Sequence, residues 1–173
     1  MNKIKEKINT IPDWPKKGIT FCDITTLIKD PEGLKICIDN FYERYKEMKI
    51  GAVVGIEARG FIVGSVLAYL LGVGFIPIRK KGKLPGKVIK KEYALEYGTD
   101  TIEIHEDSIK KGERVLLIDD LIATGGTMLA SCELLELIKV KIVECACIID
   151  IPDVGGSKKL KIAGYKVYSQ VKF

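Results

Sequence analysis

The stretch Val115-Leu-Leu-Ile-Asp-Asp-Leu-Ile-Ala-Thr-Gly-Gly-Thr127 carries the strongest structural signal in this chain. Its four leading apolar residues predict a buried strand over 115–118, with two carboxylates at the strand's end. A short loop with two glycines follows, and a helix is expected to begin after it. Backbone N–H groups at a helix N-terminus suit a phosphate, and adjacent carboxylates suit sugar hydroxyls or a cation beside it. The stretch therefore predicts a site for a ribose 5-phosphate.

The rest of the chain alternates helix and strand patterns. Asp30 as N-cap and Pro31 at the first helical position predict the start of a helix, and Gly72 can end another. We expect helices over residues 2–9, 31–48, 61–71 and 127–139, strands over residues 52–56, 73–78, 115–118, 142–149 and 165–170, and a hairpin or long flap over residues 88–105. This order predicts an α/β fold with a mainly parallel, twisted sheet that carries helices on both faces.

Length and composition favour a single domain over residues 1–173. The chain is 47% apolar and 29% charged, which is typical of a globular protein with a sizeable core. No run approaches the roughly 18 apolar residues of a membrane span, and the charged N-terminus does not resemble a signal peptide. The net charge of +5 is mild, and the chain shows neither an aromatic ladder nor a zinc pattern. We therefore expect no membrane and no nucleic-acid partner.

The cysteines and the single histidine favour structural roles. Five cysteines without regular spacing predict reduced thiols in a cytoplasmic protein. Cys145 and Cys147 lie in an apolar run, so we interpret them as core residues rather than metal ligands. His105 follows an alternating pattern and is expected at an exposed strand end. A histidine-based triad or zinc site is therefore not expected.

Two further stretches could carry chemistry. In Val54-Gly-Ile-Glu-Ala-Arg-Gly-Phe61 a strand ends at an acid and an arginine whose planar group can bind an anion through two N–H groups. The alternative is an ordinary first helical turn with a solvated arginine. Arg79-Lys-Lys-Gly-Lys-Leu-Pro-Gly86 predicts a mobile cationic flap that could close over an anion, or else an exposed hairpin with ordinary lysines.

Residues 115–127 resemble the phosphoribosyl-pyrophosphate (PRPP) motif of the type I phosphoribosyltransferase family, which has four apolar residues, two acids, a short variable stretch and Thr-Gly-Gly-Thr. The resemblance implies that the two acids face the ribose hydroxyls, directly or through magnesium and water, and that the loop holds the 5-phosphate. The residues concerned are Asp119 and Asp120, followed by Ala123, Thr124, Gly125, Gly126 and Thr127. Thr124 and Thr127 are also expected to cap the following helix.

Three more segments resemble adenine-specific members of that family. The Glu57–Phe61 segment resembles the pyrophosphate loop, with Ala58 where serine is usual. Arg79–Gly86 and Leu95–Tyr97 resemble the flap, placed at about residues 79–105, and Ile11–Ile24 resembles a base-binding hood, placed within about residues 1–30. By this likeness the pyrophosphate would meet Glu57, Ala58, Arg59, Arg79, Lys80 and Lys83, adenine would meet Thr20, Phe21 and Cys22, and the catalytic residues would be Glu96, Arg59 and Tyr97.

The family resemblance implies an expected activity in purine salvage. That activity is transfer of the 5-phosphoribosyl group from PRPP to adenine, giving AMP and pyrophosphate, with Mg²⁺ as cofactor and a homodimer as the assembly. No residue is expected to bind the metal without PRPP and water. Cys22 departs from the arginine that the family commonly has, and Trp14 is expected to pack in a hydrophobic contact. The alternatives are transfer to another purine base, or a PRPP-binding regulatory protein.

Overall fold

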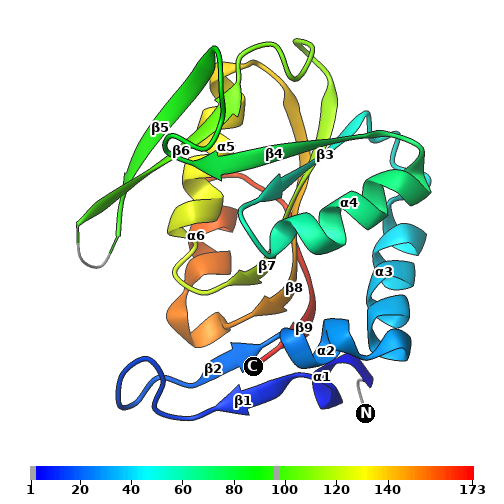
Figure 1. Cartoon of the computed structure of the whole chain (residues 1–173), viewed down its shortest axis with the longest axis vertical. Coiled ribbons are helices and arrows are strands. Elements are labelled where there is room, and N and C mark those ends of the chain that lie inside the picture. Colours follow the sequence, from blue (N-terminus) through cyan, green and yellow to red (C-terminus); the bar gives the residue numbers. More distant parts are fainter. Residues whose placement is uncertain (1–2, 96–97) are drawn as a thin grey trace.

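The structure is a computed structural model of the chain that describes residues 3–95 and 98–173 (Figure 1). Within these residues a seven-stranded sheet has the order β5-β6-β4-β3-β7-β8-β9. The strands are β3 (Ala52–Ile56), β4 (Gly74–Lys80), β5 (Val88–Ala94), β6 (Thr99–His105), β7 (Arg114–Ile122), β8 (Lys141–Asp150) and β9 (Val167–Lys172). Strands β4, β3, β7, β8 and β9 are parallel neighbours, whereas β5 and β6 form an antiparallel hairpin at one edge.

Helices cover both faces of the sheet, as the sequence predicts. Helices α3 (Pro31–Tyr45) and α4 (Gly60–Leu71) lie on one side, and α5 (Gly126–Leu137) and α6 (Gly156–Ile162) on the other (Figure 1). Successive side chains of a strand point to opposite faces. In β7, Leu116 and Ile118 therefore join the core under α3 and α4, while Val115 and Leu117 join the core under α5. A strand buried on both faces needs the continuous apolar run that the sequence shows.

Several local signals are confirmed. The Asp30 carboxylate accepts a hydrogen bond of 2.6 Å from the Gly33 N–H and so caps α3. Gly72 ends α4 in the left-handed conformation, with φ of 68°. Cys145 and Cys147 are fully buried in the core. His105 ends β6 but is half-buried rather than exposed, because its ring lies against the Pro85 carbonyl oxygen at 2.8 Å.

The N-terminal segment differs from the expectation. The helix predicted over residues 2–9 is only α1 (Lys3–Glu6) among the described residues, because Asn9 already belongs to a strand. Strands β1 (Asn9–Ile11) and β2 (Phe21–Asp23) pair antiparallel in a separate two-stranded sheet, and the short helix α2 (Thr25–Lys29) follows. This long-range pairing overrides the local helix pattern.

Two differences lie near the C-terminal ends of the central strands. Strand β7 does not end at residue 118: it runs to Ile122, because its pairing with β8 continues to Asp150. Both Asp119 and Asp120 are therefore strand residues. After β8 the 3-10 helix η1 (Pro152–Val154) and helix α6 form a connection that the sequence patterns did not predict. In the described part of the chain, no helix is both long and apolar enough to cross a bilayer.

Candidate active site

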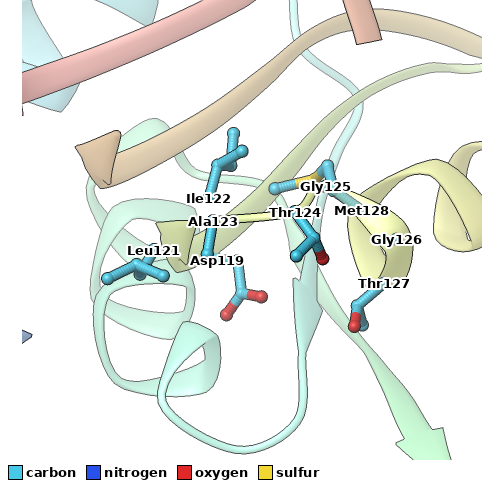
Figure 2. A pocket seen from close by; sticks show the side chains of 9 residues that line it. All are labelled: Asp119, Leu121, Ile122, Ala123, Thr124, Gly125, Gly126, Thr127 and Met128. Atoms are coloured by element: carbon cyan, nitrogen blue, oxygen red, sulfur yellow. The ribbon is translucent and has the colours of Figure 1, made fainter. Parts of the chain in front are cut away.

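The glycine-rich loop, residues 123–127, follows β7, includes the first two residues of α5 and borders a cavity of about 150 Å³. The cavity is lined by Asp119, Leu121, Ile122, Ala123, Thr124, Gly125, Gly126, Thr127 and Met128. Figure 2 shows the polar ends of Asp119, Thr124 and Thr127 on the same side of the loop, whereas Ile122 and Met128 point the other way. The first N–H groups of α5 have no acceptor within their own helix. The loop can therefore offer N–H groups and hydroxyls to one anion.

The backbone of the loop depends on glycine. Gly125 is the N-cap of α5 and adopts the left-handed conformation, with φ of 73°. Neither Thr124 nor Thr127 caps the helix through its side chain, so that expectation is wrong. The cap position itself is a glycine, which has no side chain to accept a hydrogen bond. The two threonine hydroxyls are consequently not used for capping.

The two neighbouring aspartates have different surroundings. The Arg59 Nε atom lies 2.8 Å from Asp120 Oδ2, and the side chain of Asp120 is almost fully buried. Asp119 Oδ1 accepts a hydrogen bond of 2.8 Å from the Asp120 N–H. Burial and the adjacent Asp120 carboxylate raise the pKa of Asp119 well above its ordinary value. A cation or a set of sugar hydroxyls near Asp119 would relieve this unfavourable charge.

Glu57, directly after β3, joins that strand end to β4. Its carboxylate accepts from Arg79 Nε at 3.2 Å and from the Lys80 N–H at 2.8 Å. The hydrogen bond from the Arg79 side chain is the main cause that lowers the pKa of Glu57, and Lys83 contributes by its charge. The structure therefore brings Glu57, Arg79, Lys80 and Lys83 together. In this arrangement Arg79 is paired with Glu57.

A second cavity, of about 310 Å³, adjoins the first and shares Asp119, Leu121 and Thr127 with it. Its lining comes from the segment between β3 and α4, from β4 and β7, from the hairpin and from the start of α5. It consists of Glu57, Ala58, Arg59, Lys80, Tyr93, Leu95, Asp100, Asp119, Asp120, Leu121 and Thr127. Four carboxylates face two cationic side chains in this lining. A polyanion could enter only if a further cation accompanied it or if more basic groups closed over it.

The predicted base-binding residues lie on or next to β2. Phe21 is half-buried, and its ring packs edge-on against Trp14 with 4.5 Å between ring centroids. Trp14 is 51% exposed, so its hydrophobic contact is a surface contact and not core packing. The Arg59 guanidinium lies 5.7 Å from the Phe21 ring centroid, which links the hood to the Asp120 ion pair. Thr20 is exposed beside this pair of rings.

A model of the phosphoribosyl transferase domain matches residues 24–172. The chain is also 58% identical, over 170 residues, to the adenine phosphoribosyltransferase of Methylobacillus flagellatus, across 98% of this chain and 97% of that protein. The chain belongs to the phosphoribosyltransferase family.

Solved phosphoribosyltransferases share the whole fold. The adenine phosphoribosyltransferase from Thermoanaerobacter pseudethanolicus is similar with a TM-score of 0.93 and 44% identity, across 99% of this chain and 98% of that one. The enzyme from Trypanosoma brucei, solved in complex with AMP, pyrophosphate and ribose-5-phosphate, is similar with a TM-score of 0.89 and 30% identity. That comparison covers 98% of this chain and 78% of the trypanosomal chain.

Cys22, the departure from the usual phosphoribosyltransferase pattern in the hood, has a structural explanation. Its side chain is 2% exposed and packs in the core under α3. Burial raises the pKa of the Cys22 thiol, which therefore stays protonated. The thiol fills a core position, so any contact with a base would come from the backbone of this strand. Glu96 and Tyr97 lie outside the described residues of this phosphoribosyltransferase.

Tyr93, Asp100 and Gly156 are residues that the sequence analysis did not single out. Tyr93 and Asp100 line the second cavity, and the Tyr93 hydroxyl lies 3.3 Å from Thr127 Oγ1 and 3.4 Å from Asp100 Oδ2. The period-two pattern of β5 could have indicated which side of the strand Tyr93 occupies, but not that α5 lies there. The backbone N–H of Gly156 donates to the Ala123 carbonyl oxygen at 2.9 Å, a contact without a local sequence signal.

Proposed function

We propose that this protein is an adenine phosphoribosyltransferase that transfers the 5-phosphoribosyl group from PRPP to adenine in purine salvage. The reaction gives AMP and pyrophosphate. The observation that carries the proposal is the pair of adjoining cavities, which share Asp119 and Thr127 and combine the glycine-rich loop with a carboxylate pair. Full-length similarity to proteins named adenine phosphoribosyltransferase supports adenine as the base.

The ribose 5-phosphate of PRPP would occupy the first cavity. The glycine-rich loop supplies N–H groups from the start of α5 together with two hydroxyls, which suits three phosphate oxygens. Asp119 lies at the shared border, with Asp120 beside it in the second cavity, where the ribose hydroxyls of such a ligand would lie. This arrangement would hold the sugar at both ends, so that its C1 atom points into the second cavity.

The pyrophosphate would leave through the second cavity, whose lining includes Ala58, Arg59 and Lys80. As the bond from C1 to the pyrophosphate oxygen breaks, negative charge grows on the leaving group. Arg59 and Lys80, with Lys83 close by, would stabilise that charge. Glu57 would position Lys80 by accepting a hydrogen bond from the Lys80 backbone N–H. Arg79 is paired with Glu57, so it would contact the pyrophosphate only after that ion pair breaks.

The base would lie against the hood. Phe21 offers an aromatic face, and Thr20 and Cys22 offer backbone groups, because β2 has only β1 as a strand neighbour in the described sheets. From the family resemblance we assign the purine proton to Glu96 and the contact over the reacting centre to Tyr97. An adenine nitrogen would then attack C1 from the face opposite the pyrophosphate.

Mg²⁺ is the cofactor that fits this site. When bound, it neutralises oxygens of PRPP. Among the described residues no cluster of three or more His, Cys, Asp and Glu could hold a metal. PRPP and water would supply the rest of its coordination. Asp119, whose raised pKa shows that its charge is disfavoured, lines both cavities and is the side chain best placed to face such an ion, with Asp120 nearby.

Two alternative functions are separated from this one by one assay. A phosphoribosyltransferase for hypoxanthine or guanine would use the same PRPP site, and a PRPP-binding regulator would bind PRPP without turnover. Purified protein is incubated with PRPP, Mg²⁺ and each purine base in turn, and nucleotide formation is followed by chromatography. We expect AMP from adenine and little nucleotide from the other bases. PRPP binding without AMP formation would refute the proposed activity.

We also propose a homodimer that buries the outer face of α4. Four apolar side chains of this helix are exposed at helical spacing: Ile62, Val66, Tyr69 and Leu70, with Tyr69 83% exposed. Such a stripe next to Arg59 favours a second copy of the chain as its partner. Analytical ultracentrifugation should show a dimer for the wild type and a monomer for Val66→Asp with Tyr69→Asp. The control is Ile162→Asp on α6, which should stay dimeric; a monomeric wild type would refute the assembly.

A cytoplasmic location is proposed from the cysteines. All five lie in the described part of the chain, are buried and carry free thiols. Free thiols of this kind are usual in a reducing compartment.

A further inference from the structure

The glycine-rich loop lies directly on the start of α6, and two glycines make this approach possible. A Cβ atom added to Gly156 would lie 2.5 Å from the Gly125 nitrogen and 2.7 Å from the Thr124 carbonyl carbon, and closer still to the Ala123 carbonyl oxygen. In the other direction, a Cβ atom on Gly125 would lie 2.8 Å from the Gly156 carbonyl oxygen. All of these neighbours are backbone atoms, so no side-chain rotation could make room.

Backbone hydrogen bonds hold the two segments together. The Gly156 N–H donates to the Ala123 carbonyl oxygen at 2.9 Å, and the Ile151 N–H donates to the Ile122 carbonyl oxygen at 3.0 Å. Between these two bonds the 3-10 helix η1 turns the chain, and Gly155 adopts a φ of 87° at its end. The connection from β8 to α6 is therefore tied to the end of β7 at Ile122 and to the first residue of the loop at Ala123.

We infer that Gly156 is a positioning residue for the 5-phosphate. The start of α6 packs against the backbone of the glycine-rich loop and fixes the directions of the loop's N–H groups. This inference rests on the proposed function, because the loop must hold a phosphate for its shape to matter. Anion binding by backbone N–H groups requires that they converge on one point. Any side chain at residue 156 would push Ala123 and Gly125 away from that arrangement.

The test is Gly156→Ala, with Gly74→Ala as the matched control. Gly74 also has ordinary backbone angles, but a Cβ atom there would have no neighbour within 4 Å. Calorimetric titration measures the affinity for ribose 5-phosphate and, separately, for pyrophosphate with Mg²⁺. For Gly156→Ala we expect ribose 5-phosphate to bind more weakly by on the order of 10²-fold, because a displacement near 1 Å suffices for such a loss. Pyrophosphate affinity should stay within about twofold.

The KM for PRPP should rise in Gly156→Ala while Gly74→Ala behaves as wild type. Equal loss of affinity for both ligands would overturn the inference, since it would indicate a general loss of structure. Unchanged affinity for ribose 5-phosphate would overturn it as well. Either of these two results would refute only the role of Gly156. The proposed function would still stand if the wild type forms AMP.

If Gly156→Ala does not fold, hydrogen exchange on the wild type decides the question. Saturation with ribose 5-phosphate should slow exchange of the Gly156 and Ile151 amides at least tenfold, because the Gly156 N–H donates to the loop that the ligand orders and the Ile151 N–H donates to Ile122, directly before that loop. Unchanged exchange at both amides, with bound ligand verified by calorimetry, would show that the loop and the start of α6 are not coupled.

Discussion

Asp119 and Asp120 are neighbours in one strand with different tasks. Asp120 is 5% exposed and is paired with Arg59, so its charge serves to orient that arginine. Asp119 faces both cavities, and its charge is disfavoured by burial and by Asp120. An unpaired buried charge is costly unless a ligand compensates it. We interpret Asp120 as the residue that orients Arg59, and Asp119 as the residue that contacts the ligand.

Asp119→Asn should make the ligand-free protein more stable at pH 7 and less active. Since the pKa of Asp119 is raised in the folded state, the folded protein keeps a proton that the unfolded chain loses as pH rises. The free energy of unfolding of the wild type therefore falls as pH rises from the ordinary aspartate pKa through the raised one. Asp119→Asn avoids this loss of stability. It also removes the Asp119 charge that is proposed to face the ligand, so kcat/KM for PRPP should fall about tenfold or more.

Urea unfolding without ligand, at several pH values from acid to neutral, measures the effect. The stability difference between Asp119→Asn and wild type should shrink as pH falls. At low pH Asp119 of the wild type is protonated in both the folded and the unfolded state, so its titration no longer affects stability. Asp107→Asn, at an exposed loop position, serves as the control for the loss of a single carboxylate charge. A variant less stable than wild type at pH 7 would contradict the assignment.

Gly60 lets the start of α4 lie close to the carboxylate pair. A Cβ atom there would lie 2.8 Å from the Ile118 carbonyl oxygen and 3.1 Å from Asp119 Oδ1. Gly60→Ala should therefore displace Arg59 and lower kcat/KM for PRPP on the order of 10²-fold. Gly64→Ala is the comparison, because its Cβ atom would meet the side chains of Phe75 and Ile118.

Steady-state kinetics and thermal melting separate these two glycines. Gly64→Ala should lower stability by about 1–3 kcal/mol through overpacking and leave the KM for PRPP nearly unchanged. Similar kinetic losses in both variants would show that Gly60 acts only through packing.

At the scale of elements, the hairpin β5–β6 is attached to its neighbours α5 and β4 by side-chain contacts. Lys91 of β5 pairs with Glu133 of α5 at 2.8 Å, and Tyr93 reaches Thr127 at the start of the same helix. Lys80 of β4 pairs with Asp100 of β6 at 3.3 Å. The cationic flap expected from the sequence is therefore attached to α5, the helix that begins at the glycine-rich loop. A movement of the hairpin would consequently displace the start of α5.

Tyr93→Phe tests this attachment. The two contacts of the hydroxyl, 3.3 Å to Thr127 and 3.4 Å to Asp100, are at the long end of hydrogen bonding. We expect a loss of about 1 kcal/mol, seen as a three- to fivefold higher KM for PRPP with little change in melting temperature. Lys91→Met breaks a half-exposed ion pair that lines neither of the two proposed substrate cavities, and it should change KM less than twofold. Equal effects of both variants would contradict a specific role of the hydroxyl.

Element boundaries were predictable where local chemistry sets them. Asp30 starts α3 and Gly72 ends α4 as expected, because capping involves residues a few positions apart. The hairpin β1–β2 and the extension of β7 to Ile122 were not, because each depends on pairing with another segment of the chain. Helix α6 was not predicted either, and its first residue contacts the distant Ala123.

At the scale of the whole molecule, one partly buried ion pair connects α3 to the sheet. Arg44 contacts the Glu144 carboxylate through Nε at 2.7 Å and Nη2 at 2.8 Å, and the Tyr45 hydroxyl donates to the same group at 2.7 Å. Arg44 also lies 3.9 Å above the Tyr168 ring. These contacts join α3, β8 and β9 far from the cavities.

Arg44→Leu should destabilise the protein by about 2–3 kcal/mol, because it leaves the Glu144 charge buried without its partner. The melting temperature should fall by about 5–10 °C, while AMP formation at 15 °C, well below unfolding, should stay near wild type. Adding Glu144→Gln removes the charge and keeps an acceptor for Tyr45, so it should restore most of the loss. The control Lys35→Leu, at an exposed pair with Asp39, should change stability by less than about 0.5 kcal/mol. No recovery in the double variant would contradict the electrostatic cause.

The sequence by itself determined the α/β alternation, the glycine-rich loop after β7 and the four motifs of the family, since each is written in residues that are close together in the chain. Only the tertiary structure decided that Arg59 meets Asp120, that Tyr93 meets Thr127 and that Gly156 lies under the loop. These residues are between 33 and 61 positions apart, and no periodic pattern encodes contacts between elements that meet only when the sheet assembles.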